Sequence, residues 1–185
     1  MSHPKILNPE NTALVIVDMQ EAFRSPIPDF ALIAERTSLV VRGFALLDIP
    51  VIVTEQYPKG LGRTVEEILL CLPDDFEAIE KTTFSACGEA TFNEKLIATN
   101  ATQIVLCGIE SHICVNQTAH ELLAQGYQVH LLQDCISSRL THDKYTGIEK
   151  MKQSGVIPSN VEMVLFELLK DSKHEKFREI QNLIK

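Results

Sequence analysis

Apolar residues gather in short runs along the chain, and longer segments of mixed polarity separate these runs. Several runs are continuously apolar rather than alternating, which is typical of strands covered on both faces. The predicted strands span residues 12–18, 50–55, 76–81, 103–108, 127–134 and 161–166. The spacing of the runs leaves room for a helix between most successive strands.

The segments between the strands show helical periodicity. Within residues 30–47, Ile33, Val40, Phe44 and Leu47 form one stripe at helical spacing. Four more helices are predicted at residues 92–100, 111–126, 142–155 and 173–185. Strands that alternate with helices predict a parallel sheet with helices on both faces. We therefore expect one three-layer α/β domain, of Rossmann-like type, over residues 1–185.

Composition narrows the class of function. The chain has 185 residues, a net charge of −8 and 23% charged residues, and its acidity argues against a nucleic-acid partner, since such proteins carry basic surfaces. It has no apolar run long enough for a membrane span, so no membrane partner is expected. The first ten residues lack the apolar segment of a secretory signal, and the five cysteines have no disulfide-framework spacing. We expect reduced thiols in a cytoplasmic protein.

Three chemically useful side chains follow the predicted strands. In open parallel sheets, ligands bind beyond the carboxyl ends of the strands. Asp18 ends the first strand, Lys81 ends the third, and Cys114 follows a turn after the fourth. Taken singly, each has a structural interpretation: a capped turn, a solvated charge and a core thiol. Together they predict a site for nucleophilic chemistry.

The position of Cys114 bears on its reactivity. With Ser111 as the N-cap, Cys114 is the third residue of the next helix, where free N–H groups and the helix dipole lower a thiol pKa. The same N–H groups are suited to an oxyanion. Asp18 is then placed to accept the thiol proton, while Lys81 stabilises the negative charge. Glu110 would act in the opposite direction, because a nearby carboxylate raises a thiol pKa.

Three blocks of sequence resemble those of the isochorismatase-like cysteine hydrolase superfamily. They are "VIVDMQEAF" at the first strand, "EKTTFSA" at the third and "GIESHICVNQTA" at the fourth. The segments "TEQYPKGLGRTVEE" and "MKQSG" resemble those of the isochorismatase domain-containing subgroup. The resemblance implies a six-stranded parallel sheet of order 3-2-1-4-5-6. Strands one and four are then neighbours, and so are Asp18 and Cys114.

The resemblance also implies roles for individual residues. Asp18 would be the general base, Lys81 would orient and stabilise charge, and Cys114 would be the nucleophile. Backbone N–H groups of Ile113 and Cys114 would form the oxyanion hole. A cis peptide bond would join Ile109 and Glu110.

The chain departs from the superfamily's metal-dependent nicotinamidases. Those enzymes hold a metal with an Asp-x-His pair after strand two, whereas this chain reads Thr-Glu-Gln-Tyr at 54–57 and has no histidine between His3 and His112. We therefore expect no metal and no other cofactor. True isochorismate hydrolases generally lack the cysteine that this chain keeps. The predicted reaction is metal-independent hydrolysis of an amide, ureido or carbamoyl C–N bond in a small molecule, through a thioester acyl-enzyme.

Four residues that follow the ends of the predicted strands are candidates for contact with the substrate. Gln20, Phe23, Gln56 and Phe84 are predicted to line an apolar cleft with a few polar groups. The resemblance suggests a homo-oligomer, a dimer or larger. The segment "KGLGRT" at 59–64 is then either a flap or subunit contact near the site, or a plain surface loop.

Other interpretations stay open. The chain could be a binding or scaffold protein that has lost turnover, or a redox-responsive protein in which Cys114 is oxidised and Cys107 or Cys135 resolves it. Otherwise Cys107 and Cys135 are inert core thiols. His112 is expected at the surface or at an interface. Arg139, after the fifth strand, is interpreted as an exposed structural arginine, with a substrate carboxylate or a neighbouring subunit as alternatives.

Overall fold

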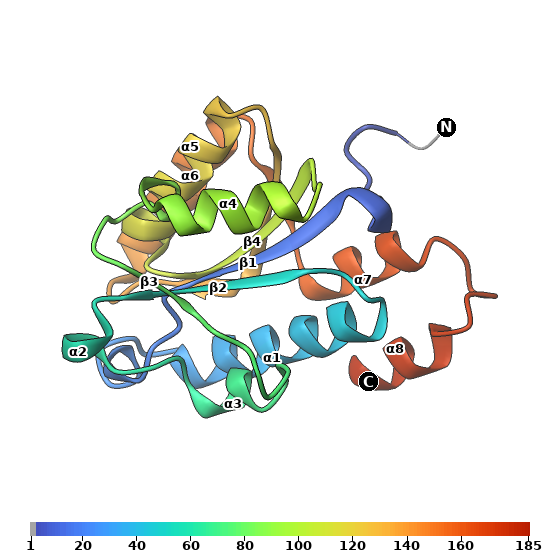
Figure 1. Ribbon diagram of the computed structural model, residues 1–185, viewed down its shortest axis with the longest axis horizontal. Coiled ribbons are helices and arrows are strands. Elements are labelled where there is room, and N and C mark those ends of the chain that lie inside the picture. The colour runs from blue at the N-terminus through green and yellow to red at the C-terminus, as the bar shows by residue number, and fades with distance from the viewer. Residues whose placement is uncertain (1–2) are drawn as a thin grey trace.

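A six-stranded, all-parallel sheet forms the centre of the protein. The computed structural model describes residues 3–185 (Figure 1). Its strands are β1 (Thr12–Val17), β2 (Val51–Gln56), β3 (Ile79–Lys81), β4 (Gln103–Ile109), β5 (Gln128–Ser137) and β6 (Ile157–Ser159). The order β3-β2-β1-β4-β5-β6 confirms the predicted topology, and β1 and β4 are neighbours at its centre.

Helices cover both faces of the sheet, as predicted. They are α1 (Phe30–Leu46), α2 (Pro58–Leu61), α3 (Glu66–Leu69), α4 (Ala90–Ala98), α5 (Asn116–Ala124), α6 (Thr141–Gln153), α7 (Val161–Leu169) and α8 (Phe177–Leu183). In Figure 1, α4, α5 and α6 lie above the sheet, and α1, α3, α7 and α8 lie below it. No helix within residues 3–185 combines the length and the apolar composition that a membrane span requires.

The two central strands, β1 and β4, are completely buried, as their continuous apolar sequences require. Every residue of β1 and of β4 is buried, because helices pack on both faces and neighbouring strands cover both edges. The strands β3 and β6 at the two edges are only three residues long. The continuous apolar runs at 12–17 and 103–109 are therefore the core of the sheet.

One predicted strand is wrong. Residues 161–166 begin the helix α7, and the sixth strand is the short segment Ile157–Ser159 just before it. The side chain of Asn160 caps the helix by accepting a hydrogen bond from the N–H of Met163. The buried residues of α7 recur every three or four positions, at Val161, Val164, Leu165, Leu168 and Leu169. The burial of this short apolar run therefore follows the period of a helix, not that of a strand.

Candidate active site

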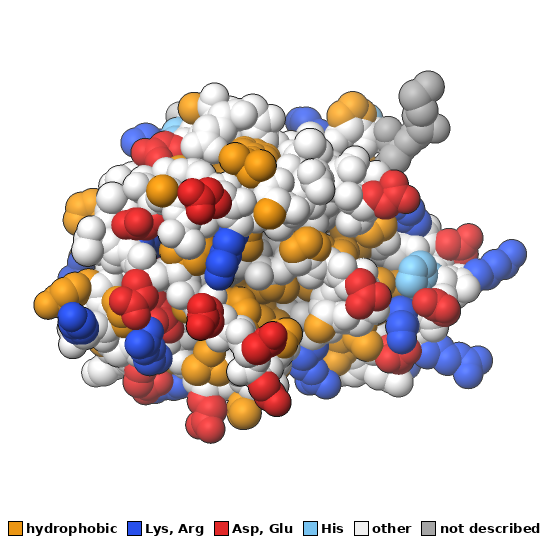
Figure 2. Space-filling view, viewed as in Figure 1, with side chains coloured by type: hydrophobic (Ala, Val, Ile, Leu, Met, Phe, Trp, Pro, Cys, Tyr) orange, Lys and Arg blue, Asp and Glu red, His pale blue; other side chains and the backbone are white. Residues whose placement is uncertain are grey.

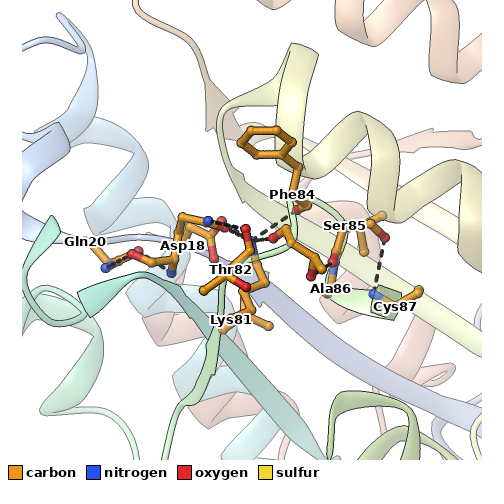
Figure 3. Close-up of polar contacts among 12 residues, drawn as sticks. Asp18, Gln20, Lys81, Thr82, Phe84, Ser85, Ala86 and Cys87 are labelled. Atoms are coloured by element: carbon orange, nitrogen blue, oxygen red, sulfur yellow. Dashed lines mark hydrogen bonds and ion pairs between the residues drawn. The ribbon is translucent and has the colours of Figure 1, made fainter. Parts of the chain in front are cut away.

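Asp18 and Lys81 meet at the carboxyl end of the sheet (Figure 3). Asp18 directly follows β1 and has a positive φ of 55°, while Lys81 is the last residue of β3. The Lys81 ammonium nitrogen Nζ lies 2.7 Å from Oδ2 of Asp18, and the hydroxyl of Thr54 donates a 2.7 Å hydrogen bond to Oδ1. Both side chains of the ion pair are buried. Because β2 lies between β1 and β3, the long lysine side chain reaches past the end of β2 to meet Asp18.

The Lys81 ammonium is held by four oxygen atoms. Besides Asp18, it donates to Oε1 of Gln56 at 2.6 Å and to the carbonyl oxygens of Thr83 and Phe84, both at 3.1 Å. Gln56 is itself fixed, because its amide nitrogen donates to the carbonyl of Thr82. Lys81 is thus a buried cation with a fixed position, not a solvated charge.

Burial makes Asp18 a stronger base than an exposed aspartate. Loss of solvation raises the pKa of its carboxyl, and the charge and hydrogen bond of Lys81 oppose that rise. The hydrogen bond from Thr54 and a contact with the Cys114 thiol also favour the charged form. The Asp18 carboxylate therefore has two neighbours of different kinds: the Cys114 thiol, which is a proton donor, and the Lys81 ammonium, which is a cation.

Cys114 lies beside the Asp18 carboxyl, on a one-turn π-helix (Ser111–Val115) between β4 and α5. Burial is the largest cause that raises the pKa of this thiol to about 12, and the negative charge of Asp18 is the next. The charge of Lys81 opposes the rise, while Glu110 adds to it. The expected direction, a pKa lowered by the start of a helix, is wrong. Cys114 is a neutral thiol at rest, with the Asp18 carboxylate near it.

Ser111 does not cap this turn. Its hydroxyl hydrogen-bonds to the hydroxyl of Ser138 at 2.7 Å, and the residue that precedes the turn is Glu110. The carbonyl oxygen of Glu110 accepts from the N–H groups of Ile113, at 3.1 Å, and Val115, at 3.2 Å. The prediction that Ser111 is an N-cap is therefore wrong, because its hydroxyl bonds Ser138 in the loop after β5.

Glu110 points towards the loop after β5. The peptide bond between Ile109 and Glu110 is cis, as the resemblance implied. Oε1 of Glu110 accepts two hydrogen bonds of 3.0 Å from Arg139, one from the backbone N–H and one from Nε. Arg139 is exposed and binds Glu110, in line with its structural interpretation. Glu110 is buried, so Arg139 neutralises a carboxylate that would otherwise have no charged partner nearby.

The close approach of β1 and β4 requires Gly108. This residue has φ 116°, and a Cβ atom added to it would lie 2.0 Å from the carbonyl oxygen of Val17. Any side chain here would push the two strands apart. Because Asp18 follows Val17 and the Cys114 turn follows β4, this close approach brings the ends of the two strands together.

The predicted substrate contacts have different surroundings. Gln20 is fully buried, and its amide bonds the backbone of Gln56 and Gly62, so in this structure it supports the edge of the site. Phe23 is half-buried against the core, and Gln56 binds Lys81. The ring of Phe84 is exposed and points away from the Asp18–Lys81 pair (Figure 3).

Glu55 fixes the segment 59–64 to the end of β2. Its Oε1 accepts from the N–H and hydroxyl of Thr64, at 2.7 and 2.8 Å, and its Oε2 pairs with Arg63 at 2.9 Å. A cavity of about 290 Å³ is lined by Tyr57, Pro58 and Lys59, where this segment begins, and by Glu80 and Lys81 of β3, among others. The start of the segment therefore borders a space next to Lys81.

Thr54 and Ser138 are site residues that the sequence reasoning missed. Thr54 lies opposite Val17 in the parallel register of β1 and β2, so a polar residue at this strand end was a usable signal. His112 is half-buried and bonds the hydroxyl of Ser138 at 3.0 Å. Within residues 3–185, no three His, Cys, Asp or Glu side chains are grouped so as to hold a metal ion.

Comparison with known proteins places this geometry in a family. Residues 12–163 match the isochorismatase domain. Isochorismatase domain-containing protein 2 is 37% identical in Danio rerio and 40% identical in Xenopus laevis, each over 178 residues, or 96% of this chain; the match covers 89% and 85% of those relatives. The solved structure of MAR1 ribonuclease from Caenorhabditis elegans is 38% identical, covers 97% of this chain and 92% of its own, and has a TM-score of 0.92. The chain belongs to the isochorismatase family.

Proposed function

We propose that the protein is a cysteine hydrolase that needs no metal ion and cleaves an amide, ureido or carbamoyl C–N bond in a small molecule. Cys114 is the nucleophile, Asp18 is the general base, and Lys81 fixes the base and stabilises charge. The observation that carries this proposal is the Cys114 thiol beside a buried, lysine-paired carboxylate. A buried ion pair at the carboxyl edge of a sheet costs desolvation energy that an apolar pair in the same place would avoid, which favours a functional role.

The geometry supports transfer of the thiol proton during attack. The Cys114 sulfur forms a bond to the substrate carbonyl carbon while its proton passes to Asp18. The protonated Asp18 then gives this proton to the leaving nitrogen, and the C–N bond breaks to leave a thioester. Water attacks the thioester, with Asp18 as the base, and the proton returns to the sulfur as the acid product leaves. The raised thiol pKa fits this sequence, because a thiolate is needed only as the bond forms.

Lys81 has a role in each of these steps. When Asp18 takes the thiol proton, the carboxylate charge disappears and the charge of Lys81 is no longer balanced. The cation then stabilises the negative charge that moves onto the sulfur or the carbonyl oxygen. The amide of Cys114 is the proposed oxyanion donor. The other proposed donor, the amide of Ile113, must first leave the carbonyl of Glu110.

The substrate is proposed to be uncharged at the reacting end. Three cations near the site already have anionic partners: Lys81 with Asp18, Arg139 with Glu110, and Arg63 with both Glu55 and Glu80. Binding an anion at Lys81 would require its buried pair with Asp18 to open. The anionic backbone of RNA fits poorly for the same reason. In addition, the face in Figure 2 intersperses acidic and basic side chains without a continuous basic surface.

The alternative functions have less support. The fully buried positions of Cys107 and Cys135 do not favour either thiol as a resolving partner that solvent oxidants can reach. A scaffold without turnover gains nothing from the Asp18–Lys81 pair beside Cys114. The homo-oligomer expected from the resemblance stays a prediction.

A substrate screen with intact mass spectrometry tests the proposal. Uncharged carboxamides, ureido compounds and carbamates are incubated with the protein, with Cys114→Ser and with Asp18→Asn. The expected result is release of ammonia or amine that requires Cys114, together with an adduct on the Cys114 peptide equal to the substrate mass minus the leaving amine. Turnover that survives Cys114→Ser would overturn the proposal.

A further inference from the structure

Three consecutive residues, the last of β5 and the two that follow it, bond to segments distant in the sequence. The hydroxyl of Ser137 donates to the carboxylate of Asp29, which precedes α1. The hydroxyl of Ser138 bonds both Ser111 and His112, and Arg139 binds Glu110. Two of the three residues thus contact the turn that carries Cys114, although they lie more than twenty positions away in sequence.

The contact between Arg139 and Glu110 extends into the backbone of the turn. The carboxylate of Glu110 receives two hydrogen bonds from Arg139, while the carbonyl of the same residue receives the N–H groups of Ile113 and Val115. Glu110 therefore links the loop after β5 to the residues on either side of Cys114. The glutamate is 5% exposed and the arginine side chain 56% exposed, so most of the desolvation falls on the carboxylate.

We propose that Arg139 is a positioning residue for the nucleophile. It holds Glu110, and through Glu110 the turn, in the place where the Cys114 thiol contacts Asp18. The inference rests on the proposed function, because it assumes that this contact is the one that matters. Arg139 has no role in bond making; it sets where the sulfur lies.

The other charged groups near the turn have different partners, so Arg139 is the residue that holds Glu110. Asp18, Lys81 and Glu110 act directly on Cys114. On α6, which packs against the turn, Lys144 pairs with Asp29 at 3.0 Å and Asp143 lies 3.8 Å from His112. Among the described ion pairs, Arg139 is the cation that pairs with Glu110.

The test measures how strongly Asp18 and Cys114 are coupled, with and without Arg139. The pH dependence of Cys114 alkylation by iodoacetamide is followed by peptide mass spectrometry in the wild type, Asp18→Asn, Arg139→Ala and the double variant. In the wild type, Asp18→Asn is expected to lower the alkylation pKa, because the Asp18 charge raises it. In the Arg139→Ala background this shift is expected to be smaller, although the backbone N–H of residue 139 still donates to Glu110. Turnover of any substrate found is expected to fall about 100-fold, as for a displacement of about 1 Å.

Two further variants separate positioning from general damage. Arg36→Ala removes an arginine from another half-buried ion pair, with Asp134, and is expected to keep the Asp18 shift intact. Arg139→Ala combined with Glu110→Gln removes the buried charge as well as the arginine, so it is expected to fold even if Arg139→Ala does not. This double variant should likewise show a smaller Asp18 shift.

The outcomes distinguish this inference from the proposed function. An unchanged Asp18 shift in both Arg139 variants would overturn the positioning role and leave the hydrolase proposal standing. A wild-type protein in which Asp18→Asn has no effect on alkylation would overturn both. The readout needs no substrate, so it can be made before one is identified.

Discussion

Lys81 and Asp18 form an ion pair across three neighbouring strands of the sheet, with β2 between them. The Nζ–Oδ2 distance is 2.7 Å, and the two side chains are 0% and 1% exposed. In a medium of low polarity, each charge is stable only because the other is present. The pair is therefore a unit, and removing either member exposes the cost of burying the other.

Replacement of Lys81 by methionine tests this interdependence. Lys81→Met is expected to lower the free energy of unfolding by about 3–5 kcal/mol, the usual cost of breaking a buried pair. Adding Asp18→Asn removes the unpaired charge, so the double variant should be more stable than Lys81→Met alone. Urea unfolding of the wild type, the two single variants and the double variant gives the coupling energy. Additive losses would show that the two charges act separately.

The reactivity of the Cys114 thiol should follow its raised pKa. Burial and the Asp18 charge raise the pKa to about 12, so the rate of alkylation of the Cys114 peptide should keep rising with pH beyond the ordinary thiol pKa of about 8.5. Asp18→Asn should bring the midpoint to a lower pH. Alkylation quenched at set times and followed by peptide mass spectrometry measures the rate and the midpoint in each protein. A plateau already reached at neutral pH would contradict this picture and indicate a preformed thiolate.

The topology and the positions of Asp18 and Lys81 in the sheet could be predicted from the sequence because they depend on strand ends. Continuous apolar runs mark β1 and β4; Asp18 follows β1, Lys81 ends β3, and the turn that carries Cys114 follows β4. The resemblance supplied the strand order, which makes β1 and β4 neighbours. Such patterns can be recognised in the sequence because a parallel sheet that is buried on both faces requires continuously apolar strands.

The parts that were not predicted depend on contacts between distant residues. Ser111 was expected to cap a helix, but Ser138, from the loop after β5, takes its hydroxyl. The thiol pKa was expected to fall, yet burial and the adjoining Asp18 decide its direction. The apolar run after Asn160 was interpreted as a strand, although its burial follows a helical period. Neither a distant partner nor the depth of burial can be read from a local pattern.

Gly108 is expected to be a position where alanine is not tolerated. Its positive φ already disfavours a side chain, and the new Cβ would collide with the backbone of Val17 at 2.0 Å. Gly126→Ala is a matched control, since Gly126 has φ 89° and nothing within 4 Å of the added Cβ. The control should lose only about 1–2 kcal/mol, the cost of the backbone conformation. Gly108→Ala should lose clearly more in urea unfolding, and equal losses would rule out a tight contact between β1 and β4.

The buried thiols should make the protein less stable in alkaline solution. Burial raises the pKa of Cys107 and Cys135 well above the ordinary thiol value, and that of Cys87 to about 11. Above about pH 8.5 the unfolded chain loses these protons while the folded chain keeps them, so stability falls as pH rises. Each thiol contributes up to about 1.4 kcal/mol per pH unit. Urea midpoints between pH 8 and 10 measure the slope, which should be shallower in Cys107→Ala even though this variant is less stable throughout. A slope that Cys107→Ala leaves unchanged would show that ionisation of other groups causes the loss.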